Sequence, residues 1–203
     1  MIKLENINLR FGNKEIFSDF SLTIKNGEKI LLNAPSGKGK SSLLKIIMGF
    51  LKPDSGQVII EDKVLSAQNV KEIRGKIAYL PQDISFPKMK VEDFIQNVLA
   101  YESNKNISYN RDSVEGMLKD LILPKDTLAQ DTSSLSGGEK QRIGILIMQL
   151  LNREIFLLDE VTSALNSELK VFITNYFLKM KQTIIVVSHD EVWQEKDLRK
   201  VVW

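Results

Sequence analysis

The chain has 203 residues, 43% hydrophobic and 27% charged, a composition typical of a globular protein rather than a disordered, collagenous or membrane-embedded one. Its 28 Lys and Arg against 26 Asp and Glu give a net charge of +2, which excludes a broad electrostatic attraction to nucleic acid or anionic lipid. The absence of cysteine excludes thiol catalysis and cysteine-ligated zinc, and leads us to expect a reducing compartment such as the cytoplasm. The longest apolar run, residues 143–148, is too short to cross a bilayer.

Alternating apolar residues at the start of the chain predict two half-exposed strands, antiparallel to each other, within residues 1–25. The apolar positions are Ile2, Leu4, Ile7 and Leu9 in the first strand and Phe20, Leu22 and Ile24 in the second. Asn26 and Gly27 then mark a turn. A short apolar run at 29–32, a glycine-rich stretch and apolar residues at helical spacing over 41–48 predict a strand, a loop and a helix.

The glycine-rich stretch has the composition of a phosphate-binding loop. It reads Ala34-Pro35-Ser36-Gly37-Lys38-Gly39-Lys40-Ser41, and Ser42 follows it. Successive backbone N–H groups between a strand and a helix can surround an oxyanion, and the helix N-terminus adds a partial positive charge. Lys40 is expected to reach the β- and γ-phosphates of a nucleotide, and the Ser41 hydroxyl to hold Mg²⁺. The alternative is an ordinary glycine-rich turn between a strand and a helix.

One position of this loop departs from the usual pattern. Ala34 stands where the first glycine of the pattern is found. A Cβ at positive φ is unfavourable by about 1 kcal/mol, so we expect Ala34 to have a negative φ.

Further along the chain, residues 57–60 and 76–80 are predicted to be strands. Residues 91–121 have a helical pattern, interrupted by a polar stretch at 102–110, and predict a helical lobe. After residue 136 the pattern predicts a helix to about 151, a strand at 155–158, a helix at 167–180 and a strand at 183–187. Helices that alternate with continuously apolar strands indicate a parallel α/β sheet.

Two carboxylates, Asp159 and Glu160, follow the apolar strand at 155–158. A parallel sheet binds its ligands at the carboxyl ends of its strands, so these side chains are expected to share an edge with the phosphate loop. Asp159 suits Mg²⁺ coordination, and Glu160 could polarise a water directed at a γ-phosphate. The alternative is a solvated acidic turn.

Another helix is predicted to begin at Ser136-Gly137-Gly138-Glu139. Ser136 and Glu139 fit a capping box, which accounts for two of the four residues. It does not account for Gly137 and Gly138, because glycine in a helix is about 1 kcal/mol less favourable than alanine. Exposed N–H groups at a helix N-terminus suit the close approach of a second phosphate.

Residues 135–142 read LSGGEKQR, which resembles the signature motif of ABC-type ATPases. The resemblance covers nearly the whole chain, from Phe11 to His189, and residues 123–126 resemble small bacterial iron or metabolite export systems. It implies a single ABC ATPase domain of α/β class, a P-loop NTPase core with a mixed central sheet, an N-terminal antiparallel β subdomain and an inserted helical subdomain. We expect the β-rich ATP-binding core to comprise residues 1–85 and 136–203, and the helical lobe residues 86–135.

The resemblance also implies roles for single residues. Phe11 would stack on adenine, where the family more often has tyrosine. Gln82 would sense Mg²⁺ and the attacking water, and His189 would contact the γ-phosphate. An alternative for His189 is an exposed position in the first turn of a helix capped by Ser188 and Glu191. Asn166 stands where the family usually has aspartate, from which we hypothesise weaker coupling between two ATP sites.

The function that the resemblance implies is Mg²⁺-dependent ATP hydrolysis by a homodimer. Two subunits meet head to tail on binding ATP, and each ATP lies between the phosphate loop of one and the signature motif of the other. We expect the dimer to power a transporter with separate transmembrane permease subunits, and to lie in the cytoplasm, peripheral on the inner face of the cell membrane. Phe86, Met89 and Phe94 either contact the permease or pack within the lobe.

Two other functions stay open at this stage. One is a soluble ABC ATPase that acts on nucleic acid or a macromolecular partner, although the near-neutral charge leads us to expect no nucleic acid. The other is a nucleotide-binding module without hydrolysis, against which Glu160 and His189 argue.

Overall fold

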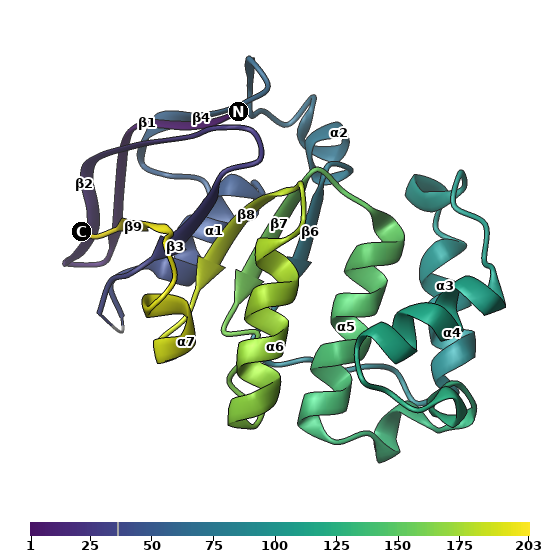
Figure 1. The fold of residues 1–203 in the computed structure, drawn as a ribbon. Coiled ribbons are helices and arrows are strands. Elements are labelled where there is room, and N and C mark those ends of the chain that lie inside the picture. Colours follow the sequence, from purple (N-terminus) through teal and green to yellow (C-terminus); the bar gives the residue numbers. More distant parts are fainter. Residues whose placement is uncertain (36) are drawn as a thin grey trace.

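The computed structural model describes residues 1–35 and 37–203, and the strands of these residues form two sheets (Figure 1). The first sheet is antiparallel, with the strand order β2-β1-β4-β5. Its strands are β1 (Ile2–Phe11), β2 (Lys14–Ile24), β4 (Ser55–Ile60) and β5 (Lys63–Val64). Ile2 pairs with Ile24 and Leu4 with Leu22, and all four are buried, which confirms the predicted antiparallel pair.

The second sheet has the order β6-β7-β8-β3-β9, and all neighbouring strands in it are parallel. The strands are β3 (Lys29–Leu32), β6 (Ile77–Leu80), β7 (Ile155–Asp159), β8 (Thr183–Val187) and β9 (Arg199–Val201). The expected α/β class is therefore confirmed. The expectation of a mixed central sheet is wrong for the described residues, because the antiparallel strands form a sheet of their own beside the parallel one. Strands β5 and β9 were not predicted, because both are short and lack a continuous apolar pattern.

Alternate residues of the parallel strands face two different hydrophobic cores. Phe156 and Leu158 of β7 belong to one core, and Ile155 and Leu157 belong to the other. Because successive side chains of a strand point to opposite faces, a strand covered on both sides is apolar throughout. This arrangement is the physical reason for the continuous apolar runs in the sequence.

Helices cover both faces of the parallel sheet. They are α1 (Lys40–Ile47), α5 (Gly137–Leu151) and α6 (Ser167–Leu178). Figure 1 shows α5 and α6 in front of the sheet, while α1 lies behind it on the side of the antiparallel sheet. The predicted helix at 167–180 thus ends two residues early, and the other two agree closely with their predicted ranges.

The other helices of the described residues have between four and ten residues. Beyond α5 lie α3 (Val91–Leu99) and α4 (Arg111–Asp120), joined by a segment that contains the 3-10 turn η1 (Glu102–Asn104). Two further 3-10 turns, η2 (Lys125–Ala129) and η3 (Thr132–Ser134), lead to α5. The short helices α2 (Val70–Arg74) and α7 (Glu191–Gln194) were not predicted, because segments of four or five residues are too short to show a helical period of apolar residues. Within the described ranges we find no helix with the length and apolar character needed to cross a membrane.

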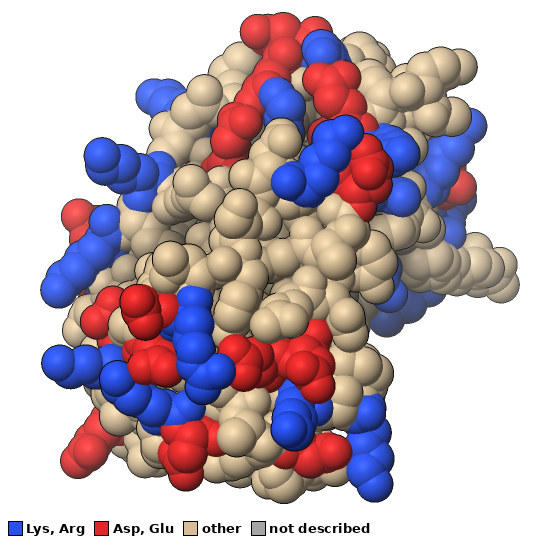
Figure 2. Space-filling model, turned by 90° about the vertical axis from the view of Figure 1, so that its right-hand side faces the viewer, with Lys and Arg blue, Asp and Glu red and all other residues tan. Residues whose placement is uncertain are grey.

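Figure 2 shows the side of the molecule that carries α3 and α4. Charged residues of both signs gather in the upper and lower parts of this face, and uncharged residues occupy much of its middle. Some of the charges form ion pairs: Arg111 with Glu92 at 2.9 Å, and Lys125 with Glu115 at 2.8 Å. Exposed pairs of this kind contribute little to stability. Because their charges are opposite, this face has no strong electrostatic field of one sign.

Candidate active site

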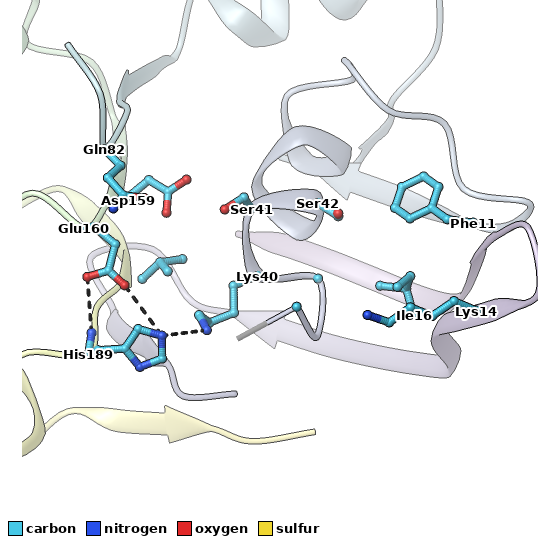
Figure 3. A pocket seen from close by; sticks show the side chains of 13 residues that line it. Phe11, Lys14, Ile16, Lys40, Ser41, Ser42, Gln82, Asp159, Glu160 and His189 are labelled. Atoms are coloured by element: carbon cyan, nitrogen blue, oxygen red, sulfur yellow. Dashed lines mark hydrogen bonds and ion pairs between the residues drawn. The ribbon is translucent and has the colours of Figure 1, made fainter. Parts of the chain in front are cut away.

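A cavity of about 430 Å³ lies at the carboxyl ends of the parallel strands, beside the loop that leads into α1 (Figure 3). Ten of the predicted site residues line it: Phe11, Gly37, Gly39, Lys40, Ser41, Ser42, Gln82, Asp159, Glu160 and His189. They come from five separate parts of the chain, so the fold brings together residues that lie up to 178 positions apart in the sequence. Ser36 lies outside the described residues.

The loop before α1 takes its shape from two glycines with left-handed backbone. Gly37 has φ 74°, and Gly39, the N-cap of α1, has φ 89°. A Cβ on Gly39 would lie 2.3 Å from the Cγ2 of Ile16, so both the backbone angle and the close approach of β2 require glycine there. Ala34 is buried and has no positive φ, as its departure from the motif led us to expect.

Lys40 lies in the first turn of α1 and is 8% exposed. Its ammonium donates to the carbonyl of Ala34 at 2.6 Å and to that of Pro35 at 3.3 Å, and lies 3.1 Å from the Nε2 of His189. Burial lowers the pKa of Lys40 below its usual range, while the carboxylates of Glu160 and Asp159 act in the opposite direction. The cation therefore faces the two acids that end β7.

Asp159 is the last residue of β7 and is 6% exposed. The hydroxyl of Tyr79, on the neighbouring strand β6, donates to its Oδ2 at 3.3 Å. Burial raises the pKa of Tyr79 to about 12, with a further contribution from the charge of Asp159. Tyr79 therefore keeps its proton at neutral pH and restrains the orientation of the carboxylate.

Glu160 follows directly and has a left-handed backbone, with φ 53°. Its backbone N–H donates to the carbonyl of Val187 at the end of β8, at 2.8 Å. A residue with a Cβ is unfavourable in this conformation by roughly 1–2 kcal/mol, and such strain is typically found at functional sites. The turn directs the Glu160 carboxylate towards the cavity, as Figure 3 shows.

His189 joins Glu160 and Lys40 in one cluster (Figure 3). Its backbone N–H donates to Oε2 of Glu160 at 3.3 Å, and its ring Nε2 lies 3.8 Å from Oε1. The alternative placement in a helix capped by Ser188 is wrong, because α7 begins at Glu191 with Asp190 as its N-cap. His189 instead lies in the loop that precedes the helix.

Phe11 and Gln82 border the cavity on opposite sides in Figure 3. Phe11 ends β1 and is 50% exposed, so one face of its ring is available to a planar ligand. Gln82 follows β6 and is exposed. Their predicted roles towards adenine and Mg²⁺ stay predictions.

The signature residues form the predicted capping box at the start of α5. The Oγ of Ser136 accepts from the backbone N–H of Glu139 at 3.3 Å, and Oε2 of Glu139 accepts from that of Ser136 at 2.8 Å. The Ser136 hydroxyl also donates to Oε2 of Glu139 at 2.7 Å, and this hydrogen bond, together with that from the Ser136 backbone, holds the pKa of Glu139 below its usual range. In the described chain the cavity lining includes none of the residues 136–139, although Gly137 and Gln82 border a neighbouring hollow of about 280 Å³.

Sequence reasoning missed four residues at the cavity. Lys14 and Ile16 on β2 line it, as does Val187, and Tyr79 binds Asp159. Lys14 could have been found from the hairpin, because it pairs directly with Phe11. Tyr79 could not, because its contact depends on which strand neighbours β7.

Residues 17–163 match the family model described as "ABC transporter". The chain is 36% identical, over 93% of its length, to a probable ABC transporter ATP-binding/permease protein from Haemophilus influenzae, of which it spans 35%. It is 35% identical, over 94% of its length, to an energy-coupling factor transporter ATP-binding protein from Mycoplasmopsis synoviae, of which it spans 74%.

Among solved structures, one similar chain is a dimeric ATP-binding cassette in a post-hydrolysis state, bound to ADP and Pi. It is 28% identical, with a TM-score of 0.78, and the match covers 95% of this chain and 90% of that one. The family model covers well over half of the chain. The chain therefore belongs to the ABC transporter family.

Proposed function

We propose that this chain hydrolyses ATP with Mg²⁺, and that hydrolysis drives a membrane transporter whose permease subunits are separate polypeptides. The observation that carries the proposal is the cluster of Lys40, Glu160 and His189 beside the phosphate loop. The name of the Mycoplasmopsis relative, an ATP-binding protein of an energy-coupling factor transporter, supports the transport part of the proposal.

The phosphate loop would hold the nucleotide. Backbone N–H groups of residues 37–42 surround the phosphates, and the ammonium of Lys40 exchanges its contacts with the loop carbonyls for the β- and γ-phosphates. The exposed ring of Phe11 offers a stacking surface for adenine.

The residues present fit a magnesium ion. The hydroxyl of Ser41, the side-chain oxygen of Gln82 and the buried carboxylate of Asp159 line one cavity, and these are the oxygen donors that Mg²⁺ prefers. A single carboxylate suffices, because in nucleotide sites the phosphates and water complete the coordination. When bound, the ion would neutralise charge on the phosphates, and Tyr79 would hold Asp159 in place for it.

Glu160 would act as the general base. Its carboxylate takes a proton from a water whose oxygen forms a bond to the γ-phosphorus, while the bond from that phosphorus to the bridging oxygen breaks and leaves ADP and phosphate. The backbone N–H of His189 restrains Oε2 of Glu160, and the ring of His189 lies close enough to Lys40 to contact the γ-phosphate beside it.

Hydrolysis would be coupled to the assembly of a homodimer. The N-terminus of α5, with Ser136, Gly137 and Gly138, lies apart from the chain's own cavity and would complete the site of a second copy placed head to tail. The dimeric relative bound to ADP and Pi supports this arrangement. Opening and closing then require that ATP favour the closed dimer more than ADP does.

The permease would dock on the side with α3 and α4, and hold the chain at the inner face of the cell membrane. The rings of Phe86 and Phe94 lie 4.6 Å apart, so these residues also pack within the lobe. Phe94 and Met89 line a groove of about 390 Å³ with Tyr101, which is 66% exposed, and all lining residues are uncharged. This groove and the uncharged middle of the face in Figure 2 suit an apolar segment of a partner.

Glu160→Gln tests the hydrolytic mechanism. An amide cannot take the proton, so the ATPase rate is expected to fall about 10²–10⁴-fold, the usual contribution of a general base. Binding of ATP is retained, because the loop and Lys40 are unchanged, and the ATP-bound dimer accumulates. Light scattering with saturating MgATP measures this dimer.

Lys40→Ala is the matched control, because it removes the phosphate contact and is expected to prevent both binding and dimerisation. A Glu160→Gln protein that stays monomeric with saturating MgATP would contradict the proposed coupling. An unchanged ATPase rate would contradict the role of Glu160 as the base.

A further inference from the structure

Trp203 contacts the phosphate loop from outside the cavity. Its indole N–H donates to the backbone carbonyl of Lys38 at 2.8 Å. Lys38 lies between the two left-handed glycines of the loop, and Trp203 is far along the chain from all three. None of the roles proposed for ATP hydrolysis involves this hydrogen bond.

The geometry of a peptide bond gives the contact a consequence inside the cavity. In a planar trans peptide, the carbonyl of one residue and the N–H of the next point in opposite directions. A donor that holds the Lys38 carbonyl outwards therefore turns the N–H of Gly39 the other way. Gly39 lines the cavity, so this N–H is one of those available to a phosphate.

The indole is itself held by an aromatic cluster on β2. Its ring centroid lies 5.8 Å from that of Phe17 and 5.3 Å from that of Phe20, and Phe17 is buried. Phe17 also lies under the loop, since a Cβ on Gly39 would be 3.1 Å from its Cζ. The same ring thus supports both the loop and the tryptophan that binds it.

Strand β9 fixes the approach of Trp203. It pairs in parallel with β3, with Leu32 opposite Val201, and the carbonyl of Val201 accepts from the backbone N–H of Asn33 at 2.8 Å. The chain that leaves β3 for the phosphate loop and the chain that leads to Trp203 therefore start side by side. In Figure 1 this end of the chain lies beside β2.

We propose that Trp203 is a positioning residue for nucleotide binding: by holding the Lys38 carbonyl, it directs the Gly39 N–H towards the phosphates. The proposal rests on the phosphate loop binding a nucleotide, as proposed above. Trp203 thus contributes to the affinity for ATP and ADP and does not take part in the chemical step.

Trp203→Phe tests this assignment, because phenylalanine keeps an aromatic ring against Phe17 and Phe20 and removes only the N–H donor. Affinity for MgADP, measured by calorimetry, is expected to fall about threefold to tenfold, the effect of one lost hydrogen bond. KM for ATP rises by the same factor and kcat changes less than twofold, because the contact is present before and during the reaction.

Phe20→Leu is the control for packing. It removes an aromatic contact of Trp203 and keeps the hydrogen bond, so MgADP affinity is expected to stay within twofold. Equal affinity of Trp203→Phe and the unsubstituted protein would overturn the proposal, as would an equal loss in Phe20→Leu. Absence of ADP binding by the unsubstituted protein would instead reject the proposed function.

If Trp203→Phe does not fold cooperatively, proton NMR of a second variant tests the role of Trp203. The chain has two tryptophans, so Trp193→Phe leaves the indole N–H of Trp203 as the single indole signal. We expect this signal to shift on saturation with MgADP, because the carbonyl that it binds belongs to the loop. A signal that does not move would overturn the proposal.

Discussion

Glu160 shows how a single backbone angle determines the chemistry of the site. A strand alternates its side chains between two faces, so Asp159 and Glu160 would point in opposite directions if β7 continued. The left-handed φ of 53° at Glu160 ends this alternation, and both carboxylates line one cavity. The carbonyl of Val187 stabilises the turn by accepting the N–H of Glu160.

Tyr79 offers a test at the same scale. Its hydrogen bond to Asp159 restrains a magnesium ligand, so Tyr79→Phe is expected to raise the Mg²⁺ concentration needed for half-maximal ATPase activity about threefold. Stability should change as well, because the pKa of Tyr79 is raised from 10.0 to about 12 in the folded protein. The neutral phenol stabilises the fold below pH 10, and this stabilisation is lost as the pH rises from 10 to 12.

Tyr109→Phe is a matched control for Tyr79→Phe. The pKa of Tyr109 is also raised to about 12, through burial and a hydrogen bond to Glu92 in the helical lobe. Between pH 9 and 12, the stability of each variant should depend less on pH than that of the unsubstituted protein, because each variant has lost one of the two shifted tyrosines. Only Tyr79→Phe should change the Mg²⁺ requirement. An equal Mg²⁺ requirement in the two variants would argue against a role for Tyr79 at Asp159.

Most of the residues that line the cavity could be predicted from the sequence, because most of them belong to local motifs. The phosphate loop and the capping box are contiguous motifs, so Lys40 and Ser136 could be predicted from their neighbours in the chain. Tyr79 and Trp203 act through side chains that meet only because of strand order and register. A local pattern contains no information on such contacts.

At the scale of elements, the continuous apolar runs predicted the parallel strands because both faces of the sheet are covered. The short elements were missed where tertiary context determines the structure. Strand β9 has three residues, of which Arg199 and Lys200 are exposed, and it forms because β3 offers it an edge. Helix α2, of five residues, carries a single buried side chain, Ile73.

Asn166 lies at the start of α6 and is also a candidate residue for coupling two ATP sites. It is the N-cap of α6, and its Oδ1 accepts from the backbone N–H of Leu169 at 2.9 Å. Asparagine and aspartate cap helices about equally well, so Asn166→Asp should change the free energy of unfolding by less than about 0.5 kcal/mol. If the missing charge weakens coupling between two ATP sites, the same variant should show a higher Hill coefficient for ATP hydrolysis.

The control for this variant is Asn166→Ala, which removes the cap and is expected to cost about 1 kcal/mol of stability. Chemical denaturation gives the two stabilities, and steady-state ATPase assays give the cooperativity. Identical rates and cooperativity for Asn166→Asp and the unsubstituted protein would reject the coupling hypothesis.

For the whole molecule, the head-to-tail dimer can be tested by complementation. Lys40→Ala disables the phosphate loop, and Gly137→Asp places a carboxylate at the signature helix, where a Cβ would make an ordinary 3.4 Å contact with Ala164. Each variant alone should be inactive. In an equimolar mixture, each mixed dimer has one intact site of two, formed by the loop of the Gly137→Asp chain and the signature helix of the Lys40→Ala chain. Part of the ATPase rate should therefore return.

Subunit exchange is checked in a second mixture, of the unsubstituted protein with Lys40→Ala. A change in the ATPase rate of the unsubstituted protein in this mixture shows that subunits exchange. Recovery of activity in the mixture requires that a loop and a signature helix from different chains form one site. A mixture as inactive as its components, under conditions in which subunits exchange, would show that each chain completes its own site.

The two-sided burial of β7 also limits how its length can change in evolution. Insertion of one residue between Ile155 and Asp159 would exchange the side chains that face the two cores and would turn Asp159 away from the cavity. The polar residues 102–110 have no such register to keep, and loop length changes stability only slowly. Natural variation in length should therefore accumulate in that segment of the lobe, while the five residues of β7 keep their spacing.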